Sequence, residues 1–332
     1  MTAQPSFLIN VATNVTEMRE ETSKPAGHHA KAVVTALFVT ILWASSWVII
    51  KFGLEEISPL TYAGMRYGIA SLVLVSFSMR RDTTRAHFKN RSRAWWRRLL
   101  AYGLVFITAT QGAQFLALYY LPAITLSLLL NLTPMLVLVI SIPMLSEIPS
   151  LGETGFILLG LAGVLLYFYP ADLFSLSAVG LIVGLVALVS NSLSSILGRA
   201  INRSGETPYL VVTTVSMSFG SVFLLLAGLV LEGSVAFSWT SLVYVLWLAI
   251  VNTALAFTLW NKAMTHLRAI DMTLINSTMM PQIVLLSLLF LGEYPSIPDW
   301  IGLTLLAVSV AAVQVLQFKR SDGRPADTLG KG

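Results

Sequence analysis

The sequence predicts an all-α integral membrane protein with ten transmembrane helices, arranged as two five-helix repeats of inverted topology. Composition is the first observation behind this prediction, because 56% of the 332 residues are hydrophobic and only 11% are charged, whereas soluble domains are roughly 25% charged. A soluble fold has too little interior to bury so much apolar surface. The second observation is a series of ten apolar segments, and the third is an internal repeat.

The internal repeat relates residues 117–151 to residues 263–297 at a constant offset of 146 positions. Ten of the thirty-five aligned positions are identical, including Glu147 with Glu293, where chance would give roughly three in a chain of this composition. Each copy lies in a block of five apolar segments. Because five is odd, the second block must enter the membrane from the opposite side, and this produces an inverted repeat.

Each predicted helix is a mostly apolar stretch of about 20 residues, the length that crosses about 30 Å of hydrocarbon. Turn-forming residues separate many of the stretches, as at Ser58-Pro59, Leu121-Pro122 and Pro295-Ser296. In chain order the segments are 33–52, 59–79, 98–118, 123–146, 151–169, 177–200, 208–231, 239–262, 270–292 and 296–318.

The basic residues predict the orientation of these helices. Nineteen of the 21 Lys and Arg residues fall in the two tails and in the loops on one side, eight of them in the 80–98 loop. Basic loops stay in the cytoplasm, so both termini are predicted to be cytoplasmic. The predicted domains are a polar tail (1–32), a first repeat (33–170), a second repeat (177–318) and a C-terminal tail (319–332).

Polar side chains near the helix centres are concentrated in the first, third and fourth segments of each repeat, whereas 151–169 and 296–318 are almost wholly apolar. A polar group in hydrocarbon usually faces a cavity or another helix, so the polar segments are predicted to enclose a common centre. For the amide side chains, cavity lining and hydrogen bonding between helices remain equal alternatives, and for the serines the alternative is close helix packing. The candidate cavity residues are Trp43, Ser46, Trp47, Gln111, Gln114, Asn131, Asn191, Ser195, Asn252 and Asn276.

Two tryptophans stand out among these candidates because tryptophan normally prefers the membrane interface. Trp43, Ser46 and Trp47 share one helical face by their spacing. The two indoles are interpreted either as core packing or as a stacking surface for an aromatic or cationic ligand.

Three further residues interrupt apolar segments. Pro134 and Pro281 lie near the centres of 123–146 and 270–292, where each removes a helical hydrogen bond and produces either a static kink or a gating bend. Arg66 lies within 59–79. It is predicted to pair with a backbone carbonyl, to reach the membrane interface or to attract an anionic ligand group, and a structural role is favoured.

The residue inventory also excludes several classes of site. The chain has no cysteine, so it forms neither disulfides nor thiolate metal sites. The four histidines lie in tails or loops, and there is no HExxH motif. No catalytic residue, metal site or cofactor is therefore predicted, and an intramembrane enzyme is a minor alternative. Because the net charge of +5 resides in the loops, it does not indicate a nucleic-acid partner.

Several motifs resemble landmarks of the EamA domain, the repeat of the drug/metabolite transporter superfamily. Ile41-Leu42-Trp43-Ala44-Ser45-Ser46-Trp47 followed by Met65-Arg66-Tyr67 resembles its opening. Leu132-Thr133-Pro134, Glu147-Ile148-Pro149 and Leu291-Gly292-Glu293-Tyr294-Pro295 resemble its later landmarks, although Ser146-Glu147 departs from the usual Gly-Glu. The overall pattern is most similar to bacterial aromatic amino-acid and methyl viologen exporters. The resemblance implies ten helices, cytoplasmic ends, and export or exchange of small metabolites through a central cavity.

The leading hypothesis is therefore a transporter that exports or exchanges amino acids, aromatic or otherwise hydrophobic, by alternating access in a bacterial inner membrane. A multidrug exporter of lipophilic cations is the alternative. The expected partners are a small-molecule substrate and the lipid bilayer. The sequence leaves open the exact substrate, the energy coupling, and whether the protein is a monomer or a homodimer.

Overall fold

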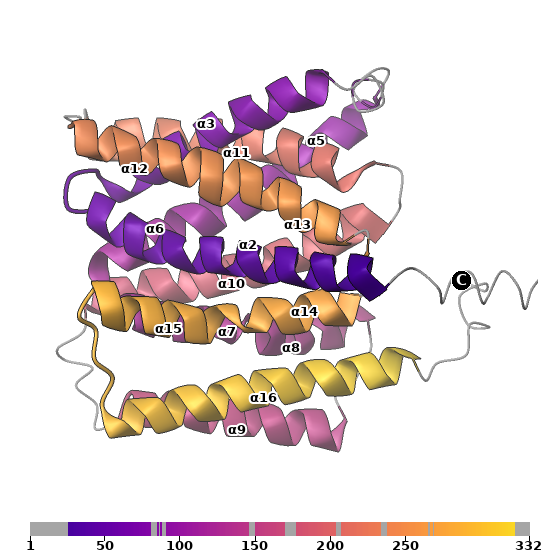
Figure 1. The fold of residues 1–332 in the computed structure, drawn as a ribbon, viewed down its shortest axis with the longest axis vertical. Helices are drawn as coiled ribbons and strands as arrows, with labels where there is room; N and C mark the ends of the chain where they lie inside the picture. The colour runs from indigo at the N-terminus through magenta and orange to yellow at the C-terminus, as the bar shows by residue number, and fades with distance from the viewer. Residues whose placement is uncertain are drawn as a thin grey trace, which may run out of the picture.

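The computed structural model describes residues 26–80, 85, 87, 91–145, 150–169, 177–203, 207–233, 238–264, 266–267 and 269–322. Within these ranges all regular secondary structure is helical (Figure 1). Among the described residues, eight helices are long and apolar enough to cross a membrane. Residues 1–25 and 323–332 of the two predicted tails lie outside the described part. The rest of each tail is helical, because the first helix begins at Ala26 and the last helix ends at Asp322.

Two predicted segments form shorter apolar helices, Leu151–Tyr167 and Ile275–Phe290. The 17 residues of Leu151–Tyr167 give a helix about 25 Å long, slightly less than a typical hydrocarbon core. The second lies within the predicted segment 270–292 and contains a one-residue turn at Thr278.

The helices follow one another along the chain without a long connection inside the described ranges. The first half contains α2 (Ala26–Gly53), α3 (Pro59–Met79), α5 (Arg93–Gly103), η1 (Leu104–Ala109), α6 (Thr110–Tyr120), α7 (Ala123–Asn131), α8 (Thr133–Leu145) and α9 (Leu151–Tyr167). The second half contains α10 (Ala178–Arg203), α11 (Tyr209–Glu232), α12 (Trp239–Ala249), η3 (Ile250–Leu255), α13 (Ala256–Met264), α14 (Ala269–Ser277), α15 (Met279–Phe290) and α16 (Ile297–Asp322).

The irregular features of the helices repeat at the same 146-residue offset as the sequence. The π-helical turns η1 and η3 begin at Leu104 and Ile250. The break between α7 and α8 falls at Leu132, and the break between α14 and α15 falls at Thr278. Both pairs of positions are 146 residues apart. The two halves therefore share local backbone structure over a longer stretch than the sequence identities indicate.

The two helix breaks lie next to the two central prolines. At each break the backbone N–H bonds three residues back, from Leu132 to Leu129 and from Thr278 to Ile275. Pro134 and Pro281 lie two and three residues after these breaks. Proline has no N–H to continue the helical ladder of hydrogen bonds. Each proline therefore lies just beyond a local break in its helix, and both the kink and its use in gating stay predictions.

Close glycine contacts hold helices of the two halves together. A Cβ atom on Gly64 of α3 would lie 2.6 Å from the Cα of Leu225 in α11, and one on Gly228 of α11 would lie 2.6 Å from the nitrogen of Thr61 in α3. Only glycine allows two helix backbones to approach so closely. The helices α9 and α16 form a second such pair, at one edge of the molecule (Figure 1), and expose Leu158, Leu165 and Val308, as expected of lipid-facing helices.

Two carboxylates of the second half cap helices of the first half. The backbone N–H groups of Leu60 and Thr61, at the start of α3, each donate to Glu232 at 2.9 Å. The N–H groups of Ala123 and Ile124, at the start of α7, donate to Glu293 at 2.7 and 2.9 Å. A helix N-terminus has unpaired N–H groups and a partial positive charge, so a carboxylate satisfies both. These caps join the two halves at the same end of the molecule.

Candidate functional site

The polar candidates divide into three groups according to their hydrogen bonds. Two amides bond between helices. Asn252 of η3 is 0% exposed and donates to the carbonyl of Leu42 and to Ser45 Oγ of α2, the latter at 3.1 Å. Asn191 of α10 donates to Thr133 Oγ1 of α8 at 3.0 Å. For these two residues the structure favours helix association over cavity lining.

A second group bonds within its own helix. Asn131 donates to the Ser127 carbonyl at 2.8 Å, Ser46 donates to the Trp43 carbonyl at 2.6 Å, and Ser195 donates to the Asn191 carbonyl at 2.9 Å. Such bonds satisfy a polar side chain without a partner helix. These side chains consequently need no cavity to remain stable in an apolar surrounding.

The third group keeps donors or acceptors available. Gln114 is partly exposed and Asn276 is exposed, and neither side chain bonds to a described residue. Gln111, on α6, is partly exposed and accepts a 2.6 Å hydrogen bond from the Tyr67 hydroxyl of α3. These three amides are the candidates best placed to meet a ligand.

The two tryptophans occupy different environments. Trp47 is 4% exposed and belongs to the main hydrophobic core. Trp43 is partly exposed, and its ring centroid lies 5.5 Å from that of Phe257 and 4.9 Å from that of Trp260, both on α13. An aromatic stacking surface therefore remains a prediction for the Trp43 cluster, whereas Trp47 packs as core.

Arg66 forms the most unusual polar neighbourhood of the structure. Its Nε donates to Thr253 Oγ1 of η3 at 3.0 Å, and the Thr253 hydroxyl donates in turn to the Leu248 carbonyl at 2.8 Å. The guanidinium carbon lies 5.1 Å from the ring centroid of Tyr67 and 5.8 Å from that of Phe115. Residues of α3, η3 and α6 thus meet around one buried cation.

Sequence reasoning did not place Tyr67, Phe115 or Thr253 in a site. An isolated arginine inside an apolar segment was the available signal, because intramembrane charge usually marks function. Tyr67 is the next residue in the chain, but Thr253 lies 187 residues from Arg66 and Gln111 lies 44 residues from Tyr67, so no local pattern reveals these contacts.

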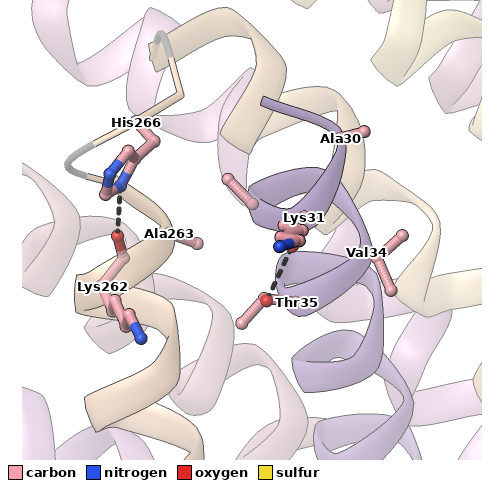
Figure 2. Close-up of a pocket in the computed structure, with 8 residues that line it drawn as sticks. Ala30, Lys31, Val34, Thr35, Lys262, Ala263 and His266 are labelled. Carbon is pink, nitrogen blue, oxygen red and sulfur yellow. Dashed lines mark hydrogen bonds between the residues drawn. The ribbon is translucent and has the colours of Figure 1, made fainter. Parts of the chain in front are cut away.

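A cavity of about 550 Å³ lies between the ends of α2 and α13 nearest the N-terminus of α2 (Figure 2). Lys31 and Thr35 line it from α2, Lys262 and Ala263 line it from α13, and His266 follows in the next turn. The Thr35 hydroxyl donates to the Lys31 carbonyl at 2.7 Å. The volume is in the range of small-molecule sites. Its polar lining is basic rather than acidic.

Metal ions in proteins are bound by groups of His, Cys, Asp or Glu side chains. Among the residues that the structure describes, no three His, Cys, Asp or Glu side chains group closely enough to hold a metal ion.

The comparison with known families decides the identity of the fold. The EamA-like transporter family matches residues 30–169 and again residues 178–314. The chain belongs to the EamA-like transporter family. It is accordingly a multi-pass membrane transporter of the drug/metabolite transporter superfamily, and the two matches correspond to its two repeated halves.

Curated relatives of this EamA-like transporter are also named as transporters. The uncharacterized transporter YvbV of Bacillus subtilis is 30% identical over 61% of this chain and 65% of its own length. The uncharacterized inner membrane transporter YicL of Salmonella typhimurium is 27% identical over 89% of this chain and 99% of its own length. A probable amino-acid metabolite efflux pump of Salmonella typhimurium is 26% identical over 68% and 75%.

A solved crystal structure shares the fold of this EamA-like transporter. It covers 87% of this chain and 99% of its own, with a TM-score of 0.62 and 20% sequence identity. At that identity the similarity concerns the fold alone.

Proposed function

We propose that this EamA-like transporter exports or exchanges small amino-acid-like metabolites across a bacterial inner membrane by alternating access. The observation that carries the proposal is family membership across both halves of the chain. The relative named as a probable amino-acid metabolite efflux pump supports the substrate class. The relative named as an inner membrane transporter supports the location.

The proposed topology has ten spans in two inverted five-helix repeats, occupying residues 33–170 and 177–318. The two shorter helices complete each repeat, α9 as the fifth span and α14 with α15 as the ninth. The shared irregularities at a 146-residue offset support the equivalence of the halves. Two equivalent halves that exchange conformations are the usual basis of alternating access.

Both termini are proposed to lie in the cytoplasm, because nineteen of the 21 basic residues fall on that side. The basic cavity between α2 and α13 then lies at the cytoplasmic end of these helices (Figure 2). A reporter enzyme that works only in the cytoplasm should be active when fused after Lys319, and one that works only outside should be active in a fusion at Glu232. The reverse pattern would contradict the topology.

Transport is tested with the purified full-length protein in liposomes. Vesicles are loaded with unlabelled amino acid, and uptake of the labelled amino acid is followed in a counterflow assay, with protein-free vesicles as the control. Aromatic amino acids, small aliphatic amino acids and lipophilic cations form the panel. Exchange of amino acids supports the proposal. Exchange of lipophilic cations without competition by any amino acid would instead identify a drug exporter.

A further inference from the structure

Arg66 is a buried cation whose position is tightly constrained. Its side chain is 5% exposed, and its Nε donates to Thr253 Oγ1 at 3.0 Å. The rings of Tyr67 and Phe115 lie against the guanidinium, 5.1 and 5.8 Å from its central carbon. Aromatic faces attract a cation without neutralising it. The Thr253 bond therefore fixes the plane of the guanidinium while its charge stays uncompensated.

The terminal nitrogens of Arg66 are the part of the side chain that remains available. Neither Nη1 nor Nη2 forms a hydrogen bond with a residue that the structure describes, and no described carboxylate pairs with them. A buried charge without a partner costs free energy in a membrane, so such residues usually meet their counter-ion as part of function. The missing partner is an anion.

Gln111 supplies a second available donor next to the same tyrosine. Its Oε1 accepts the Tyr67 hydroxyl at 2.6 Å, which directs its Nε2 group away from Tyr67. That Nε2 group donates to no described residue. Gln111 is partly exposed and Arg66 is buried, so the amide of Gln111 is the more accessible of the two donors.

The charge balance indicates which kind of anion fits. Among the described side chains, Arg66 is the only buried basic residue. One guanidinium neutralises one negative charge and presents two parallel N–H groups to a planar two-oxygen acceptor. A carboxylate matches both properties. A phosphate dianion would leave one charge uncompensated, and a lipophilic cation would be repelled.

We propose that Arg66 and the amide of Gln111 form the subsite that binds the carboxylate of the transported metabolite, with Thr253 as the positioning residue. This inference rests on the proposed function, because it assigns the substrate class of that transport. It predicts that a carboxylate is required for binding, whereas an amino group is not required by these residues.

The test uses counterflow of labelled phenylalanine by the full-length protein in liposomes. Two competitors separate the charged groups: phenylpropionate keeps the carboxylate, and phenethylamine keeps the amine. For the wild type we expect phenylpropionate to compete and phenethylamine to compete poorly. Arg66→Gln should weaken the apparent affinity for phenylalanine on the order of ten- to hundredfold, the range of a charge-assisted hydrogen bond. Phenylpropionate should then stop competing, while the competition by phenethylamine stays unchanged.

Three further variants keep the test independent of folding. Arg66→Lys should restore part of the affinity, because it keeps the charge but loses the planar pair of donors. Thr253→Val should keep carboxylate selectivity with a smaller loss of affinity, and Gln111→Leu should reduce the affinity for both carboxylate compounds alike. Lys51→Gln removes a partly buried charge on α2 and serves as the control. Thermal unfolding without ligand establishes that each variant is folded.

The outcomes distinguish the subsite from the proposed function. A wild type that exchanges no carboxylate compound refutes the proposed function. A wild type that exchanges phenylalanine while folded Arg66→Gln keeps the preference for phenylpropionate refutes the subsite alone. An equal loss for all three compounds in folded Arg66→Gln assigns Arg66 a structural role and also overturns the subsite. If Arg66→Gln does not fold, an unchanged affinity of folded Gln111→Leu for phenylalanine and phenylpropionate overturns the subsite.

Discussion

The Glu232 cap offers a direct measurement of what holds the two halves together. Glu232 ends α11 and accepts three hydrogen bonds from α3, from the N–H groups of Leu60 and Thr61 and from Thr61 Oγ1, each at 2.9 Å. The side chain of the N-cap residue Ser58 makes no capping bond. The distant carboxylate therefore replaces a local cap. Glu232→Ala removes all three acceptor contacts at once.

The magnitude follows from the type of bond. A hydrogen bond to a charged group contributes about 1.5–3 kcal/mol, and an ordinary helix cap contributes about 0.5–2 kcal/mol. Water reaches the partly exposed Glu232 site and will rebond some of the freed N–H groups. We therefore expect Glu232→Ala to lower the free energy of unfolding by about 2–3 kcal/mol, more than one cap and less than the sum of three charged bonds. Glu232→Gln keeps one acceptor oxygen and should lose roughly half as much.

The assay is denaturant unfolding of the purified protein in one detergent, followed by tryptophan fluorescence. Glu55→Ala is the matched control, because Glu55 lies in the adjacent loop, is exposed and forms no side-chain hydrogen bond in the structure. Thr61→Val, alone and combined with Glu232→Ala, completes a double-mutant cycle. If Glu232→Ala differs from Glu55→Ala by less than about 0.5 kcal/mol, the size of an ordinary surface substitution, the capping argument is wrong.

Three further predictions concern selectivity, pH and packing. Trp43→Ala should weaken transport of aromatic substrates several-fold more than that of small aliphatic ones, since a stacked ring contributes about 0.5–1.5 kcal/mol. Trp239→Ala is the control, because the Trp239 side chain is 84% exposed. Equal loss for every substrate would mean that Trp43 only packs. The hydroxyls of Ser238 and Ser241 donate to Glu56 and hold the pKa of this carboxyl below its usual value. The stabilising contribution of Glu56 is therefore complete above the ordinary glutamate pKa of about 4.3 and is lost as the pH falls through the depressed pKa. Melting curves of the wild type and Glu56→Gln should converge at acidic pH, and a constant difference would contradict this. Gly163→Ala should destabilise the α9–α16 contact by about 1–3 kcal/mol, because the new Cβ would lie 2.8 Å from the Gly302 carbonyl oxygen. Gly155→Ala on the same helix is the control, because its Cβ would meet no atom within 4 Å. Equal unfolding midpoints for the two variants would argue against backbone contact at Gly163.

Helix content and the repeat were predictable because both depend on local properties of the chain. In lipid, each backbone polar group must bond within its own segment, so a long apolar stretch has little choice but to form a helix. The breaks at Leu132 and Thr278 follow from Pro134 and Pro281 by the same local logic. The offset of 146 residues that aligns Glu147 with Glu293 also relates η1 to η3, although no residue pattern announced a π-helical turn.

The assignment of polar side chains was decided only by the tertiary structure. Asn131, Asn191 and Asn252 are the same residue type inside apolar segments, yet the first bonds within its helix and the other two bond to neighbouring helices. Glu232 lies 172 residues from Leu60, and Arg66 lies 187 residues from Thr253. The sequence alone determined that this chain is a two-fold repeated helical membrane protein, because apolar length and proline position act locally. Which carboxylate caps which helix, and which cation is left without a counter-ion, depended on how the helices rotate and cross, because those contacts exist only once distant segments have packed together.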